Sequence, residues 1–197
     1  MNADPDTGII VLAAGASRRM KKPKQLLRFE GRTLLRRAVE TALETGFRPA
    51  IVVLGANFES LRPEIADLRV ETLFNRDWET GLSSSIRAGL DHLLETAPET
   101  AAVVLTLADQ PFVNAAHLVS LAATHRRTRK PIVAARYNGG LGVPALFARE
   151  VFDELRALTG DRGAKAVIEH DRERVAVVDL PEAARDIDTP ADFAGLF

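Results

Sequence analysis

The chain has 197 residues, of which 46% are hydrophobic and 27% are charged, and its formal net charge at pH 7 is −1. This length can bury a substantial core without cross-links, and the near-neutral charge gives no overall sign of nucleic-acid or membrane binding. The absence of cysteine excludes disulfides, thiolate metal ligands and a cysteine nucleophile. We therefore expect one domain over residues 1–197, with neither nucleic acid nor membrane as a partner.

The N-terminal sequence MNADPDTG has neither a basic region nor an apolar region of the kind found in secretion signals. No apolar run approaches the roughly 20 residues that a membrane helix needs. These two features favour a cytoplasmic location.

Short apolar runs alternate with segments of helical periodicity. Buried strands are predicted at residues 8–14, 49–55 and 101–109, further strands at 70–75 and 131–137, and a late strand at 174–180. Helices are predicted at 33–46, 58–68, 83–96 and 114–127, with Gly46 as a C-cap and Ser83 or Ser84 as an N-cap. After a turn-rich, briefly extended segment at 138–150, the chain ends in a turn and a helix that starts at Pro190, with Thr189 as its N-cap.

This alternation, with nearly continuous apolar strands, predicts a three-layer α/β fold: a mostly parallel sheet with helices on both faces. In such folds, ligands bind beyond the carboxyl ends of the strands.

The first strand runs into a small-residue loop at Gly15 and then into a basic cluster. Arg18, Arg19, Lys21, Lys22 and Lys24 all follow Gly15 within ten residues. Free backbone N–H groups in such a loop favour anions, although the segment is neither a Walker A loop nor GxGxxG. An anion site and a solvated basic turn are both compatible with this pattern.

Asp109 directly follows a strongly apolar strand, where an exposed charged residue is not expected by chance, and Pro111 then turns the chain. A carboxylate there suits Mg²⁺ shared with phosphates, but a turn-capping aspartate is the alternative. Asp186, Asp188 and Asp192 are likewise either a second carboxylate near the metal or an acidic helix start.

Gly81 and the serines at 83–85 precede a helix. Their hydroxyls and amides are candidates to hold a ribose, a base edge or a phosphate, with helix capping as the alternative. The four histidines, His92, His117, His125 and His170, show no metal-ligand spacing, and we interpret them as structural or surface residues.

Taken in order, these motifs resemble the MobA/MocA-like nucleotidyltransferases, and most closely the molybdenum cofactor cytidylyltransferases. The segment LAAGASRRMKKPKQLL is similar to the family pattern LAAGxSxRMGxxKxLL and keeps Leu12, Ala13, Ala14, Gly15, Ser17, Arg19, Met20, Lys24, Leu26 and Leu27. Later segments, WETGLSSSIRAGL, LADQP, GVPALF, LTGDRGAKAVI and DIDTPADF, extend the resemblance over about residues 8–197.

The resemblance implies a Rossmann-like nucleotidyltransferase fold and a reaction. A nucleoside triphosphate with Mg²⁺ binds over the first loop, the phosphate of a small-molecule acceptor attacks the α-phosphorus, and pyrophosphate leaves without a covalent enzyme intermediate. The implied catalytic residues are Arg19, Lys24 and Asp109, and the metal ligands are Asp109 and Asp188. The implied nucleotide contacts are Leu12, Ala13, Ala14, Gly15, Ser17, Gly81, Ser83 and Ser85.

Ala13 and Ala14 stand where guanylyl-transferring relatives have glycines, which implies CTP as the donor and molybdopterin or molybdenum cofactor as the acceptor. A molybdoenzyme that receives the cofactor is then a candidate partner. Leu141 and Val143 depart from the basic residue and Gly-His-Pro or Gly-Asn-Pro step of many cofactor cytidylyltransferases, which leaves the acceptor open. The alternatives are transfer to another phosphorylated acceptor, a non-catalytic accessory protein that binds nucleotide or cofactor, and an oxidoreductase, since some members carry redox names.

Overall fold

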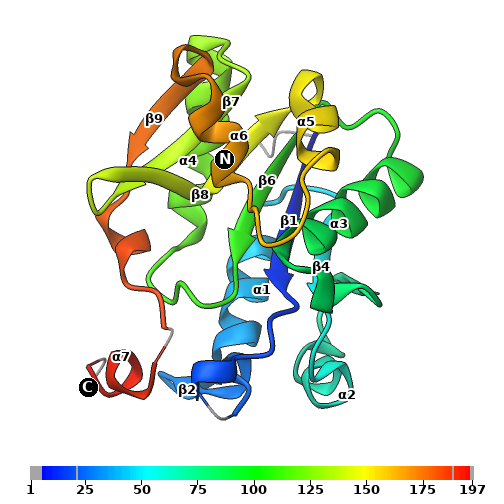
Figure 1. Cartoon of the computed structure of the whole chain (residues 1–197), viewed down its shortest axis with the longest axis vertical. Helices are drawn as coiled ribbons and strands as arrows, with labels where there is room; N and C mark the ends of the chain where they lie inside the picture. The colour runs from blue at the N-terminus through cyan, green and yellow to red at the C-terminus, as the bar shows by residue number, and fades with distance from the viewer. Residues whose placement is uncertain (1–5, 21, 188, 196–197) are drawn as a thin grey trace.

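The computed structural model describes residues 6–20, 22–187 and 189–195, with the Arg19 side chain left out, and their centre is a seven-stranded sheet (Figure 1). The strand order is β5-β4-β1-β6-β8-β7-β9. The strands are β1 (Thr7–Ala13), β4 (Ala50–Leu54), β5 (Glu71–Phe74), β6 (Ala102–Leu107), β7 (Ile132–Tyr137), β8 (Gly140–Ala148) and β9 (Val175–Asp179). A small hairpin pairs β2 (Arg28–Phe29) with β3 (Arg32–Thr33).

Helices cover both faces of the sheet. Residues of α1 and α4 pack with one face of β1, β4 and β6, and residues of α3, α5 and α6 pack with the other. The α-helices are α1 (Leu34–Glu44), α2 (Phe58–Leu61), α3 (Leu82–Thr96), α4 (Ala115–Thr128), α5 (Phe152–Arg156), α6 (Lys165–His170) and α7 (Pro190–Ala194). The 3₁₀ turns are η1 (Arg18–Met20), η2 (Lys24–Leu26), η3 (Arg62–Ile65), η4 (Trp78–Thr80), η5 (Arg149–Val151), η6 (Arg172–Arg174) and η7 (Pro181–Ala184).

The sheet confirms the predicted three-layer, mostly parallel architecture. β1 pairs in parallel with β4 and with β6, and β4 with β5 and β7 with β9 are also parallel. The strands β1 and β4 are buried along their whole length, as expected for a sheet covered on both faces.

One strand was underestimated from the sequence. β8 spans nine residues and runs antiparallel to both β6 and β7, where only a brief extended segment was predicted. Its glycines at 140 and 142 and Pro144 are residue types that strands normally avoid, so the local sequence weakens the strand signal although long-range pairing fixes the strand.

The predicted serine cap of the third long helix is wrong. α3 begins at Leu82 with Gly81 at its N-cap, so Ser83 and Ser84 lie inside the first turn. Gly81 has φ 110°, and a Cβ on it would stand 2.4 Å from the carbonyl oxygen of Gly160. The close approach of a distant loop therefore fixes where α3 starts, which local sequence cannot reveal.

The predicted Thr189 cap is confirmed, whereas the C-cap of α1 is Thr45 and not Gly46. Gly46 lies one residue beyond the C-cap of α1 with φ 77°, a conformation that favours glycine. The Thr189 hydroxyl accepts the N–H of Asp192, and Pro190 is the first residue of α7. No helix of the described part of the chain is both long and apolar enough to cross a membrane.

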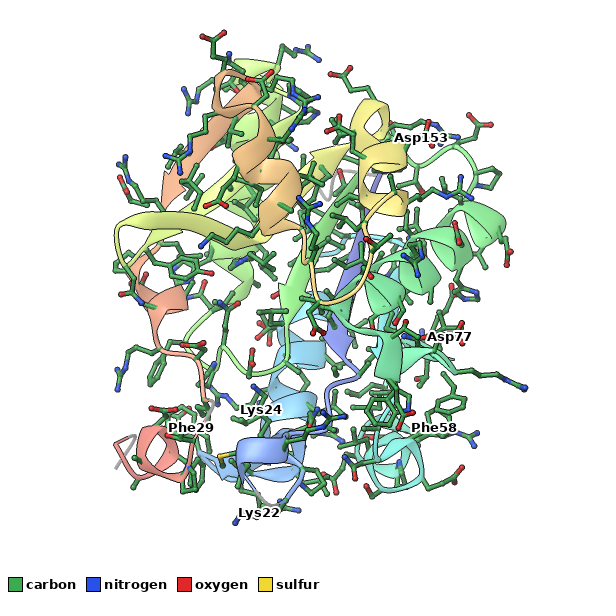
Figure 2. All side chains as sticks on the ribbon, in the orientation of Figure 1. Lys22, Lys24, Phe29, Phe58, Asp77 and Asp153 are labelled. Carbon is green, nitrogen blue, oxygen red and sulfur yellow. The ribbon has the colours of Figure 1, made fainter. Side chains whose placement is uncertain are left out.

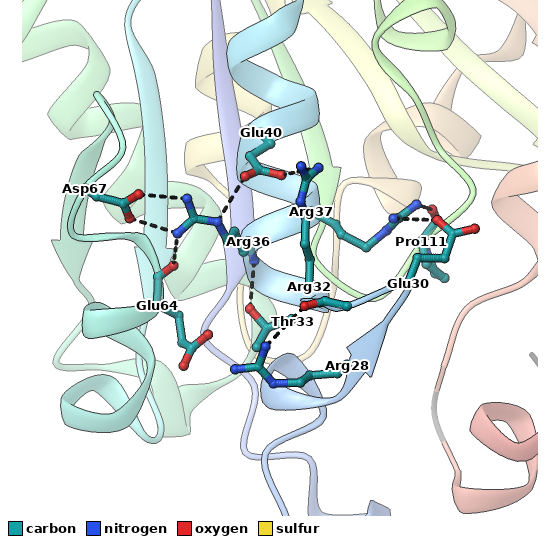
Figure 3. A network of polar contacts seen from close by, with 11 residues as sticks. Arg28, Glu30, Arg32, Thr33, Arg36, Arg37, Glu40, Glu64, Asp67 and Pro111 are labelled. Carbon is teal, nitrogen blue, oxygen red and sulfur yellow. Dashed lines mark hydrogen bonds and ion pairs between the residues drawn. The ribbon is translucent and has the colours of Figure 1, made fainter.

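An ion-pair network on α1 holds the loops around it (Figure 3). Arg36 donates to both carboxylate oxygens of Asp67 at 2.8 and 2.7 Å and thereby holds the pKa of Asp67 below its usual range. Arg37 donates to the Pro111 carbonyl at 3.3 Å and pairs with Glu30 at 2.8 Å. Helix α1 is thus attached to the turn that follows β6.

Stability should depend on pH through the pair that joins α5 to the start of β9. Arg174 donates to both oxygens of Glu154 at 2.7 and 2.9 Å, and these bonds hold the pKa of Glu154 below its ordinary 4.5. A lowered folded-state pKa stabilises the fold above the ordinary value and loses that contribution as the pH falls through the folded-state value. We predict that Glu154→Gln lowers the melting temperature at pH 7 and that its difference from wild type shrinks below pH 4.5.

Thermal denaturation followed by circular dichroism between pH 3 and pH 8 measures this difference. Glu95→Gln, an exposed site on α3, is the control and should show little effect at any pH. A Glu154→Gln deficit that stays constant with pH would rule out the ion pair as its cause.

Candidate functional site

A cavity of about 430 Å³ opens at the carboxyl ends of β1 and β6. Its volume is in the range of small-molecule sites. Figure 2 shows Lys24 on the side of its segment that faces the sheet, and Lys22 on the outer side. The described lining residues are Leu12, Ala13, Ala14, Gly15, Ala16, Arg18, Lys24, Gln25, Trp78, Glu79, Gly81, Leu82, Ser85, Leu107, Ala108, Asp109 and Asp161.

The buried side-chain amide of Gln25 anchors the loop after β1 through hydrogen bonds. Gln25 is 3% exposed and donates to the carbonyl oxygens of Ala13 and Gly15 at 3.1 and 2.8 Å. Ser17, which has φ 54°, donates to Gln25 at 3.1 Å and accepts the backbone N–H of Lys24 at 3.0 Å. These bonds fix the loop so that Lys24 projects toward the sheet.

Lys24 meets Asp109 across the cavity. Its Nζ lies 2.5 Å from Oδ2 of Asp109, and the two side chains are only 16% and 17% exposed. The other oxygen, Oδ1, is buried and has no hydrogen-bond partner among the described residues. A half-satisfied, largely buried carboxylate is costly, so Oδ1 is open to a further positive ligand.

The turn after β6 is tied to the C-terminal part of the chain. Ile187 donates its backbone N–H to the Asp109 carbonyl at 3.0 Å, and Gln110 donates to the carbonyl oxygens of Val143 and Ala183 at 3.1 and 3.0 Å. Tyr137 donates to the same Val143 carbonyl at 2.9 Å. Burial raises the pKa of Tyr137, the charges of Asp186 and Asp109 raise it further and Gln110 lowers it, so the phenol stays a donor at neutral pH.

The opposite side of the cavity is built by the start of α3. Asn75 donates to the hydroxyls of Ser84 and Ser85 at 2.8 and 3.0 Å, which orients the first turn. The backbone N–H of Ser83 donates to Gly160 at 3.2 Å, and Arg87 donates to the carbonyl of Leu158. The loop between α5 and α6 is thus docked on α3, and it brings Asp161 to the cavity.

This geometry has recognisable relatives. A family model described as "MobA-like NTP transferase domain" matches residues 9–175. The chain belongs to this MobA-like family.

Two individual relatives cover nearly the whole MobA-like chain. Nicotine blue oxidoreductase of Paenarthrobacter nicotinovorans is 33% identical, with 93% of this chain and 92% of the relative aligned. The crystal structure of Rv0371c from Mycobacterium tuberculosis H37Rv is 33% identical and superposes with a TM-score of 0.83 over 98% of this chain and 97% of that one. A crystal structure of Rv0371c in complex with manganese is 31% identical by alignment, with a TM-score of 0.77 over 97% of each chain.

Most of the residues that the sequence predicted for the site lie together at this MobA-like cavity. They are Leu12, Ala13, Ala14, Gly15, Lys24, Gly81, Ser85 and Asp109. Ser17 and Ser83 do not line it: the Ser17 hydroxyl is used inside the loop, and Ser83 is fully buried in the first turn of α3. The Arg19 side chain and Asp188 lie outside the described part of the structure. Asp192 serves as the reciprocal cap of α7, as the helix-start alternative predicted.

Sequence reasoning missed several lining residues. Trp78 and Glu79 belong to the segment WETGLSSSIRAGL, and Asp161 belongs to LTGDRGAKAVI. Both segments resemble the family, but the resemblance did not indicate that these three residues line the cavity. Gln25 was visible only as a polar residue between Lys24 and an apolar pair. Arg18 lines the cavity although its position is variable in the family pattern.

Removal of the Gln25 amide should loosen the loop. We predict that Gln25→Ala lowers the free energy of unfolding by about 2–3 kcal/mol, because it leaves two carbonyl oxygens unpaired and opens a void. Urea denaturation measures this loss, and Lys22→Ala, an exposed position on the same loop, should stay within about 0.5 kcal/mol of wild type. Equal stability of the Gln25 and Lys22 variants would contradict the anchoring role.

Proposed function

We propose that the chain, acting as one domain in the cytoplasm, transfers CMP from CTP to a phosphorylated acceptor, molybdopterin or the molybdenum cofactor, and releases pyrophosphate. The observation that carries the proposal is the Lys24–Asp109 pair at the carboxyl ends of neighbouring parallel strands. One of its members attracts phosphate and the other attracts a divalent cation. Both face a cavity large enough for a nucleotide.

The cationic side of the site would bind the triphosphate. Lys24 and Arg18 line the cavity next to the small residues 13–16, whose backbone a phosphate can approach closely. Arg19 keeps its proposed role from the family motif. Together these groups would hold the α-phosphorus in line with the acceptor and stabilise charge that builds on its oxygens.

The buried Oδ1 of Asp109, which has no hydrogen-bond partner among the described residues, fits Mg²⁺, which takes one or two carboxylates together with phosphate oxygens. Asp188 is the proposed second ligand, because its neighbour Ile187 is hydrogen-bonded to Asp109. When bound, the cation would neutralise phosphate charge and polarise the α-phosphoryl group. The manganese complex of Rv0371c supports the use of a divalent cation in this family.

The chemistry needs no protein nucleophile. An oxygen of the acceptor phosphate forms a bond to the α-phosphorus while the bond to the bridging oxygen of the β-phosphate breaks, and pyrophosphate carries away the electron pair. Lys24 can stay protonated throughout as a charge-assisted donor. The new diphosphate link would join CMP to the acceptor, for delivery to a molybdoenzyme.

The name of one relative supports a second candidate. Nicotine blue oxidoreductase is 33% identical over most of the chain, so an oxidoreductase reaction is the second candidate. The same assay distinguishes two further alternatives. One is transfer to a phosphorylated acceptor other than molybdopterin, and the other is nucleotide or cofactor binding without turnover.

The donor should be CTP. Ala13 and Ala14 line the cavity and are only 4% and 7% exposed, and their methyl groups would leave less room for a purine than glycines would. We predict that kcat/KM for CTP exceeds that for GTP by about tenfold or more, the size of discrimination that one methyl can give. Pyrophosphate release is measured with each nucleoside triphosphate, Mg²⁺ and either molybdopterin or a sugar phosphate.

An Ala13→Gly/Ala14→Gly double variant is the matched comparison and should gain activity with GTP. Preference of the wild type for GTP would reject the cytidylyl assignment. Oxidation of NAD(P)H with nicotine blue as the acceptor, without pyrophosphate release, would favour the redox candidate. Nucleotide binding without either reaction would favour the accessory protein.

Asp109 separates catalysis from binding. We predict that Asp109→Asn reduces turnover by orders of magnitude while the melting temperature stays near that of wild type, because the change keeps the shape and removes the charge that would hold the cation. Asp153→Asn, at a side chain that is 98% exposed, is the control. A stable Asp109→Asn enzyme with wild-type turnover would remove Asp109 from the reaction, whereas lost stability with retained activity would make it a turn residue.

A further inference from the structure

We infer that Trp78 is the surface on which the base of the bound nucleotide stacks. The inference rests on the proposed function, which supplies the nucleotide, and it adds a binding residue that the family pattern did not indicate. Trp78 opens η4, lines the cavity and is half-buried.

Trp78 packs closely against Gly55, a residue that has no side chain. A Cβ on Gly55, the residue after β4, would stand 2.6 Å from Cβ and 2.8 Å from Cγ of Trp78, and 2.9 Å from Cβ of Ala14. Gly55 therefore has Trp78 and Ala14 as immediate neighbours, and both residues line the cavity. Trp78 and Ala14 therefore belong to the same part of the cavity wall.

The strand order separates this wall from the charged pair. β4 and β6 flank β1 on opposite sides, so the ends of these two strands are two strand spacings, about 9.5 Å, apart. Trp78 packs at the end of β4, and Asp109 with Lys24 stands at the end of β6. A nucleoside triphosphate with its phosphates at Lys24 therefore extends across the β1 loop toward Trp78.

The charges give the nucleotide the same direction. Arg18 and Lys24 come from the segment after the β1 loop, whereas Glu79 is the neighbour of Trp78 and Asp161 adjoins Gly81. Negative side chains repel phosphates and accept hydrogen bonds from amino groups such as the exocyclic N4 of cytosine. The Trp78 side of the cavity thus suits a base and not a phosphate.

Stacking on an aromatic ring tolerates every base, because each base has a π face. Trp78 would supply affinity, and the alanine methyls would supply the choice between pyrimidine and purine. The two contributions can therefore be separated by mutation.

The experiment uses intrinsic fluorescence, because Trp78 is the chain's single tryptophan. CTP with Mg²⁺ should change the emission in a saturable way, whereas tripolyphosphate with Mg²⁺ should bind in competition with CTP and change the emission little. A free pterin, which represents the acceptor ring, should not displace CTP. Calorimetry gives the affinities of the variants that lack the fluorophore.

Trp78→Leu should weaken CTP binding by about 5- to 100-fold, leave tripolyphosphate affinity unchanged and preserve the circular dichroism spectrum. Trp78→Phe keeps an aromatic face and should retain most of the affinity. The inference is overturned if Trp78→Leu binds CTP as wild type does, if tripolyphosphate affinity falls equally, or if pterin and not CTP alters the emission. If wild type binds neither CTP nor tripolyphosphate, the proposed function itself fails.

Discussion

The parallel pairing of β1 with both β4 and β6 is the constraint on which the site depends. Parallel strands end at the same edge of the sheet, so the loop after β1 lies between the residues that follow its two neighbours. Asp109 reaches Lys24 from one side, and Gly55 supports Trp78 on the other. The fully apolar strands make this arrangement stable, because each is buried on both faces by helices.

Within that frame, polar side chains that bond to the loops and helix ends around the cavity determine where its charged groups point. Gln25 holds two carbonyl oxygens of the β1 loop, Arg37 holds the turn at Pro111, and Asn75 holds the hydroxyls of the α3 start. Each anchor is a side chain that donates to a loop or a first helical turn, so the geometry of the site is prepared before any ligand binds. Such preorganisation is what electrostatic catalysis requires.

Apolar periodicity predicted the strand–helix alternation, and the strand-end position of Asp109 together with the family motif placed Lys24 and Asp109 in one site. The direct ion pair between them was not predicted. The sequence-based predictions were wrong where contacts between distant segments determine the local structure. Gly81, not a serine, is the N-cap of α3 because Gly160 approaches it, and β8 is a full strand because β6 and β7 pair with it. Trp78 and Asp161 reach the cavity through contacts with Gly55 and Gly81, which no single segment encodes. Ser17 and Ser83 matched the expected motif but do not line the cavity. The Ser17 hydroxyl donates to Gln25 within the loop, and Ser83 is fully buried.

We propose that the Lys24–Asp109 ion pair breaks when nucleotide binds. Lys24 then binds phosphate, and Asp109 binds the divalent cation. A crystal structure with CTP and Mn²⁺, with manganese located by anomalous scattering, tests it most directly. The account predicts manganese bound to an Asp109 oxygen, the Lys24 Nζ on a phosphate oxygen, and the 2.5 Å pair broken. An intact Lys24–Asp109 pair, with CTP and manganese bound elsewhere, would contradict the account.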